Sequence, residues 1–170
     1  MRLETPSIVR AVGLVVSALL LVSCGDDDGG TTGSNTSAPV LLNVRILALN
    51  PEKANTNVTY DISSDFTDAN GDVQGGQCEV LLDGQSLGRA TLTADPGTSA
   101  TLTSGFVECE FFVNSPVPKQ IPGTFRIFDL AGNQSNDQNF VLTITLLPRG
   151  SSSGGAGPVT GRMGSATLKR

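Results

Sequence analysis

The sequence predicts an all-β fold, a single antiparallel β-sandwich of seven or eight strands over residues 39–148. Several short stretches alternate apolar and polar residues with a period of two, which is the pattern of a strand with one buried face. Turn signals separate these stretches at regular spacing, as in antiparallel sandwiches. No stretch has the period of an amphipathic helix, and the segment has a length typical of one domain.

The first three strands are predicted from this alternation and from the turns that close them. The first strand covers residues 40–49 and ends at Asn50-Pro51. The second covers residues 58–67, and the third covers residues 77–82 and ends in the hairpin turn Asp83-Gly84. The side chains expected to face the core are Val58, Tyr60, Ile62, Ser64 and Phe66 in the second strand, and Cys78, Val80 and Leu82 in the third.

The remaining strands are shorter or less regular. Two threonine-rich strands are expected at residues 87–93 and 98–103, separated by the turn Asp95-Pro96-Gly97. Strands at residues 125–129 and 140–147, joined through Ala131-Gly132-Asn133, complete the set. Between these pairs lies another strand, whose inward row is Val107, Cys109, Phe111 and Val113.

Two segments resemble parts of immunoglobulin-like (Ig-like) domains. Residues 66–73 (FTDANGDV) are similar to the turn after the second strand in PKD-like and cadherin-like bacterial domains. Residues 124–135 (TFRIFDLAGNQS) are similar to the penultimate strand and turn of bacterial Ig-like repeats. The resemblance implies an Ig-like β-sandwich that serves in display, adhesion or spacing. The chain departs from antibody domains because it has no tryptophan to pack on a core disulfide.

The amino-terminal residues have the features of an export signal. Arg2 and Arg10 are followed by residues 11–22, an uncharged and almost wholly apolar stretch that is too short to cross a bilayer, which needs about 20 residues. Leu21-Val22-Ser23-Cys24 resembles the lipobox of bacterial lipoproteins. The resemblance implies cleavage before Cys24 and acylation of its thiol with a diacylglycerol, which makes the lipid bilayer a partner. The alternatives are an ordinary signal peptide with a chance cysteine, or an uncleaved signal anchor.

Four segments follow from these features. Residues 1–23 form the signal peptide, residues 24–38 a flexible acidic and Gly/Ser/Thr-rich tether, residues 39–148 the sandwich, and residues 149–170 a disordered basic Gly/Ser-rich tail. The tether is a solvated spacer, or its run Asp26-Asp27-Asp28 is a sorting signal similar to those of some surface lipoproteins. The tail is solvated, or it makes a weak contact with anionic envelope polymer. The expected location is the bacterial cell envelope, at the outer membrane or cell surface rather than the inner membrane.

Charge and composition exclude several classes of function. Without residues 1–23 the chain has 9 basic and 15 acidic residues, a net charge of −6, which argues against nucleic acid as a partner. The chain has no histidine, so it has no Ser-His or Cys-His pair and no histidine-based zinc site. We therefore expect no enzyme. The carboxylates on predicted strands are expected on solvated faces; they are Asp61, Asp65, Glu79, Glu108 and Glu110.

The cysteines predict one disulfide. With Cys24 acylated, Cys78 and Cys109 remain, and both lie on the apolar faces of their strands. Disulfides persist outside the cytoplasm, so an oxidised Cys78–Cys109 pair between the sheets is expected. Two buried thiols are the alternative.

An acidic turn is the one candidate for a metal site. Asp68, Asn70 and Asp72 have the alternating spacing of a calcium loop, in which oxygens converge on one hard cation. Asp65 or Asp129 could assist, and Glu79 falls at the twelfth position from Asp68. Against an EF-hand, Val73 stands where that loop needs glycine, and a plain turn is the alternative, because Asn-Gly is a strong turn signal.

Two functions are compatible with these predictions. The first is an envelope lipoprotein that displays an Ig-like module for binding or spacing, with an unidentified envelope or surface protein or glycan as partner. The second is an accessory subunit of a larger envelope or secretion assembly, with no ligand of its own. No cofactor is certain, and calcium is the only candidate.

Overall fold

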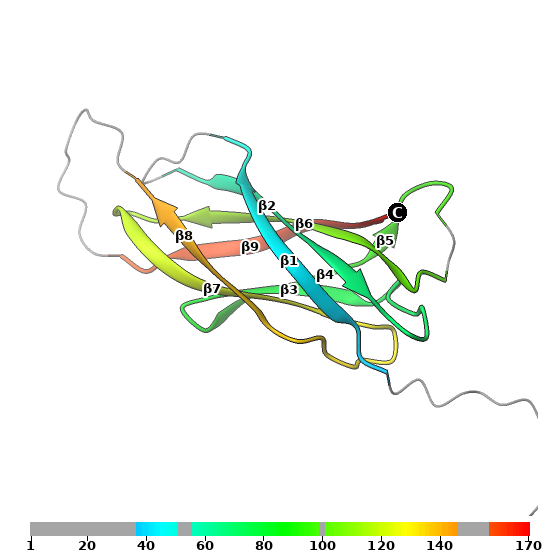
Figure 1. The fold of residues 1–170 in the computed structure, drawn as a ribbon. Helices are drawn as coiled ribbons and strands as arrows, with labels where there is room; N and C mark the ends of the chain where they lie inside the picture. Colours follow the sequence, from blue (N-terminus) through cyan, green and yellow to red (C-terminus); the bar gives the residue numbers. More distant parts are fainter. Residues whose placement is uncertain (1–36, 51–55, 99–100, 146–156) are drawn as a thin grey trace, which may run out of the picture. The chain divides into compact units, whose positions relative to one another are not determined.

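The computed structural model describes residues 37–50, 56–98, 101–145 and 157–170, which form an all-β fold of two sheets (Figure 1). The sequence prediction of an all-β, two-sheet domain is confirmed. The described residues form nine strands: β1 (Val40–Ala48), β2 (Val58–Thr67), β3 (Gln77–Leu82), β4 (Gln85–Thr91), β5 (Thr93–Ala94), β6 (Ser104–Asn114), β7 (Lys119–Phe128), β8 (Gln138–Ile144) and β9 (Thr160–Lys169).

The five-stranded sheet has the order β1-β2-β6-β9-β5, and the four-stranded sheet has the order β4-β3-β7-β8. Neighbouring strands are antiparallel except for β5 and β9, which form a short parallel pair. The arrangement therefore departs from the purely antiparallel sandwich that was predicted.

The alternation predicted for the second and sixth strands is confirmed. Val58, Tyr60, Ile62, Ser64 and Phe66 are all buried, and so are the inward residues predicted for β6. Tyr60 lies opposite Phe111 in the register, and the two rings stack with their centroids 5.3 Å apart. Ser64 is a buried polar residue in this row, and its hydroxyl donates to the carbonyl oxygen of Leu42 at 2.5 Å. This hydrogen bond satisfies the buried hydroxyl.

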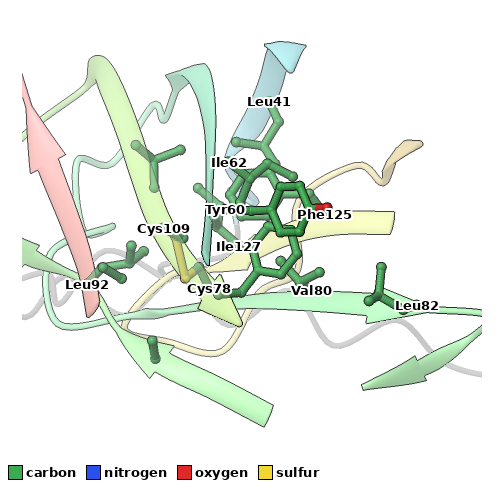
Figure 2. Close-up of a cluster of buried hydrophobic side chains, with 14 of the residues drawn as sticks. Leu41, Tyr60, Ile62, Cys78, Val80, Leu82, Leu92, Cys109, Phe125 and Ile127 are labelled. Carbon is green, nitrogen blue, oxygen red and sulfur yellow. A yellow bond between two sulfur atoms is a disulfide. The ribbon is translucent and has the colours of Figure 1, made fainter. Parts of the chain in front are cut away.

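A disulfide joins the two sheets through the core. Cys78 in β3 is bonded to Cys109 in β6, and both residues are fully buried (Figure 2). The predicted pairing is confirmed. Because the two strands belong to different sheets, the bond restrains the spacing between the layers.

The turn that ends β3 is also confirmed. Asp83 and Gly84 have φ angles of 49° and 75°, the left-handed values of a two-residue hairpin, and Leu82 pairs with Gln85 across it.

The strand expected at residues 98–103 does not form in the described part of this segment. Residues 101–103 instead lie against the chain after β2, where the Leu102 amide donates to the Gly71 carbonyl and the Thr103 carbonyl accepts from the Asp68 amide. These backbone groups are used by a loop rather than by a neighbouring strand, so the threonine-rich composition did not decide the structure.

The strand predicted to begin at Phe125 begins at Lys119. Pro122 and Gly123 both lie within β7. Leu82 of β3 pairs with Gly123, so Pro122 lies just beyond the paired part of β3. Its carbonyl accepts from the Asp83 amide, so the missing N–H of Pro122 faces the hairpin turn and not the paired part of β3.

The largest correction concerns the tail. Residues 160–169, predicted to be disordered, form β9 between β6 and β5 (Figure 1). Ala166 and Leu168 enter the core, while Lys169 forms a 2.9 Å salt bridge with Glu108 of β6. Pairing with β6 supplies the hydrogen bonds and burial that this Gly/Ser/Thr-rich sequence does not indicate by itself. Residues 149–156 of the predicted tail lie outside the described residues.

Candidate functional site

The candidate site is the loop of residues 68–74, which follows β2 and leads to β3. It therefore crosses from the five-stranded to the four-stranded sheet at one end of the fold. The end of β7 lies beside it, because Phe128 pairs with Gln77 at the start of β3. The three residues predicted as calcium ligands, Asp68, Asn70 and Asp72, all lie in this loop.

Backbone hydrogen bonds from two other segments hold the 68–74 loop. Thr103 and Leu102 bind it on one side, as described above, and the Leu130 amide donates to the Asp72 carbonyl at 3.0 Å on the other. Gly71 has a φ angle of 71°, and a Cβ atom at this position would lie 2.6 Å from the Thr101 methyl group. A larger residue would therefore have a strained backbone conformation and would force the Thr101 side chain to move.

Several polar side-chain atoms of the loop are buried without a hydrogen-bond partner. Asp68 is only 2% exposed; its Oδ2 accepts from the Asp72 amide at 2.9 Å, but its Oδ1 has no donor. Both amide atoms of Asn70 and the Oε1 of Gln74 are buried and unpaired as well. Most buried polar groups in proteins are satisfied, so unsatisfied oxygens at alternate positions of one loop are unusual.

Negative charge is concentrated at the same place. Burial raises the pKa of the Asp72 carboxyl above its usual range, and the charges of Asp129 and Asp68 raise it further. Asp129 itself is a turn residue, because its carboxylate accepts from the backbone amide and the side-chain amide of Asn133, both at 2.7 Å. It thus supplies charge beside the loop while its oxygens are already used.

The structure does not bring the other two suggested carboxylates to the loop. Asp65 interacts with β1, where its Oδ2 accepts from the Asn43 side chain at 3.0 Å and lies 3.6 Å from an Arg45 guanidinium nitrogen. Glu79 interacts within the four-stranded sheet, where its carboxylate pairs with Arg89 and Arg126. Glu79 is the twelfth residue counted from Asp68, but the structure does not place its carboxylate at the 68–74 loop.

Carboxylates alone do not build a metal site here. Within the ranges that the structure describes, no group of three or more His, Cys, Asp or Glu side chains is placed to hold a metal ion. A cation in the 68–74 loop would therefore need the amide oxygens of Asn70 and Gln74 in addition to carboxylates. Gln74 was not among the predicted ligands, although it continues the alternate spacing of Asp68, Asn70 and Asp72.

Glu79 is the exception among the carboxylates expected on solvated faces, because it is 5% exposed. It lies opposite Arg89 on one side and Arg126 on the other, and the side chains of both arginines cover it. The Arg89 guanidinium carbon also lies 3.9 Å from the centroid of the Phe128 ring. Only the strand register, which places both arginines opposite Glu79, reveals this network.

The predicted acylation site Cys24, the signal peptide and nearly all of the tether lie outside the described residues. In the part of the chain that the structure describes, no helix is long and apolar enough to cross a membrane.

Comparisons of the chain with protein-family models, with curated proteins and with solved structures find no match.

Proposed function

We propose that the chain is a lipoprotein of the bacterial cell envelope that presents an Ig-like β-sandwich as a binding or spacing module. The observation that carries the proposal is the use of the three cysteines. Cys78 and Cys109 are bonded to each other, so the disulfide leaves Cys24, which ends the lipobox-like sequence Leu21-Val22-Ser23-Cys24. A structural disulfide also fits an oxidising compartment.

The architecture supports a module that acts through its surface. The Cys78–Cys109 disulfide links the two sheets covalently. Backbone hydrogen bonds restrain loops at the strand ends, such as the 68–74 loop. A restrained scaffold with exposed loops suits display, adhesion or spacing. Acylated Cys24 would hold this scaffold to the bilayer, since two or more acyl chains anchor a protein stably. The acidic run after Cys24 favours the outer membrane or cell surface.

Replacement of Cys24 tests the anchor. We expect Cys24→Ala to abolish incorporation of labelled fatty acid and either to release the protein from membranes or to block its processing. Cys78→Ala is the matched control, because it removes a cysteine from the folded domain and should leave labelling intact. Full labelling and membrane retention of Cys24→Ala would refute the proposal.

An accessory subunit of an envelope or secretion assembly is the second candidate, and one observation favours it. The edge strand β1 exposes aliphatic side chains, with Leu42 46% and Leu47 63% exposed. Exposed edge strands with apolar side chains are suited to pairing with another chain. Affinity isolation of the acylated protein from its own envelope should then recover one reproducible partner, and Leu47→Lys should lose it. Recovery of the same partner by Leu47→Lys would count against docking through β1.

A further inference from the structure

We propose that the 68–74 loop binds one calcium ion through side-chain oxygens of Asp68, Asn70, Asp72 and Gln74. This inference goes beyond the proposed function and does not depend on it, because it concerns the folded domain and not the anchor. It also extends the ligands expected from the sequence by Gln74 and assigns no ligand role to Asp65 or Glu79.

The 68–74 loop contains several buried side-chain oxygens without a hydrogen-bond partner. Asp68 Oδ1, Asn70 Oδ1 and Gln74 Oε1 are buried and accept no hydrogen bond, and Asp68 is almost completely buried. An unpaired buried oxygen is costly, and the cost is greatest for a carboxylate. A cation in contact with these oxygens would remove that cost for all of them together.

The chemistry and spacing of the oxygen-bearing side chains suit calcium. The four side chains occupy alternate positions of one short segment, and all of them offer oxygen. Calcium takes six to eight oxygen ligands from carboxylates, amide carbonyls and water, and it tolerates irregular geometry. Magnesium requires a nearly ideal octahedron and gives up its water reluctantly, so the mixed set of amides and carboxylates favours calcium.

The local charge of the loop also favours a cation. Asp68 and Asp129 form no salt bridge among the described residues, and Asp129 directly precedes Leu130, whose amide donates to the Asp72 carbonyl. Asp129 is committed to Asn133 through both carboxylate oxygens, so its contribution is long-range attraction for a cation. A divalent ion would neutralise the repulsion among the three carboxylates.

Equilibrium dialysis with radioactive calcium tests the site directly. The full chain, purified in mild detergent and stripped with a chelator, should bind one calcium ion per chain. Extracellular modules bind calcium at about 0.1–1 mM, so the titration extends to about 20 mM. A rise in melting temperature that a chelator reverses provides a second readout.

The variants are chosen to keep the fold. Asp68→Asn retains an oxygen that accepts from the Asp72 amide, and Asp72→Asn keeps the shape of the side chain. Each variant should weaken calcium binding about tenfold, because calcium affinity follows the charge of the ligands. Gln74→Glu should strengthen binding, a gain that misfolding could not produce. Asp83→Asn is the matched control, since Asp83 lies in the hairpin turn at the opposite end of β3, and it should bind as the parent does.

Clear results would overturn the inference. Absence of bound calcium at 20 mM would leave the loop as a turn whose buried oxygens are satisfied by water. Parent-like affinity in Asp68→Asn and Asp72→Asn would place any bound calcium elsewhere. Equal affinity for magnesium would overturn the assignment to calcium.

Discussion

Glu79 and Arg126 lie directly opposite each other on neighbouring strands of the four-stranded sheet, with the guanidinium Nε 2.8 Å from the carboxylate Oε2. The second oxygen of Glu79 accepts from the Ser86 hydroxyl at 2.6 Å and lies 3.7 Å from Arg89. A nearly buried carboxylate of β3 is thus satisfied on both oxygens by residues from the two strands beside it, β4 and β7. Because the network links β3, β4 and β7, it fixes their register as well as the charge.

The first prediction concerns Arg126. We expect Arg126→Met to lower the free energy of unfolding by about 2–3 kcal/mol, because it leaves a charged and nearly buried Glu79 with one of its hydrogen bonds lost. Urea unfolding of the purified chain measures the change. Arg45→Met is the control, since Arg45 pairs with Asp65 on an exposed surface and should change stability by less than about 1 kcal/mol. Equal effects of the two variants would contradict a special role for Glu79.

The acid stability of the domain follows from the same residue. Burial alone would raise the pKa of Glu79, but hydrogen bonds from Ser86 and Arg126 and the charges of Arg126 and Arg89 outweigh it, so the folded pKa lies below 4.5. The carboxylate therefore stabilises the fold above pH 4.5, and this contribution is lost as the pH falls through the lowered pKa. Melting temperatures measured from pH 7 to pH 3 should fall less steeply for Glu79→Gln than for the parent.

The pKa of Asp61 is shifted in the opposite direction from that of Glu79. It pairs with Glu110 across β2 and β6, and burial together with the charges of Glu108 and Glu110 raises its pKa above 3.8. A raised pKa means that the ionised form costs stability at neutral pH, and that the cost disappears as the pH falls through the raised value. We expect Asp61→Asn to stabilise the domain by about 0.5 kcal/mol at pH 7, within the range of cross-strand pairs. The gain should vanish near pH 3; a gain independent of pH would point to another cause.

The disulfide gives the fourth prediction. Cys78 and Cys109 are 31 residues apart, and closing a loop of this size stabilises a fold by about 3–4 kcal/mol in the chain-entropy model. The double variant Cys78→Ala/Cys109→Ala should lose most of this amount in urea unfolding. Alkylation of the denatured, unreduced chain followed by peptide mapping should leave both cysteines unlabelled. Labelling of both would mean that the folded protein contains two thiols.

Strands with regular alternation were predictable from the sequence, and those whose burial depends on a partner strand were not. Tyr60 and Ile62 belong to a row of apolar residues at every second position, which is the pattern of a strand with one buried face. Pro122 indicates a loop unless the end of β3 is known, and Glu79 indicates a solvated face unless Arg126 is known to lie opposite. The acidic turn was visible from Asp68. Gln74 continues its alternate spacing, but the reason to propose this amide as a ligand is the buried and unpaired oxygen seen in the structure.

The carboxyl-terminal strand was missed for a similar reason, and its role can be tested with one leucine. Leu168 is 0% exposed between β6 and β5, although it follows a stretch of glycine, serine and threonine. We expect Leu168→Ala to lower the free energy of unfolding by about 2–4 kcal/mol, because it removes buried methyl groups and leaves a cavity between the sheets. The matched control is Leu130→Ala, since Leu130 is 67% exposed and its truncation should change stability by less than about 0.5 kcal/mol. Urea unfolding measures the stability of both variants, and we expect the slope of the unfolding free energy against urea concentration to stay unchanged. If the two variants were equally stable, Leu168 would lie outside the core, and the tail would be the solvated segment that its composition indicates.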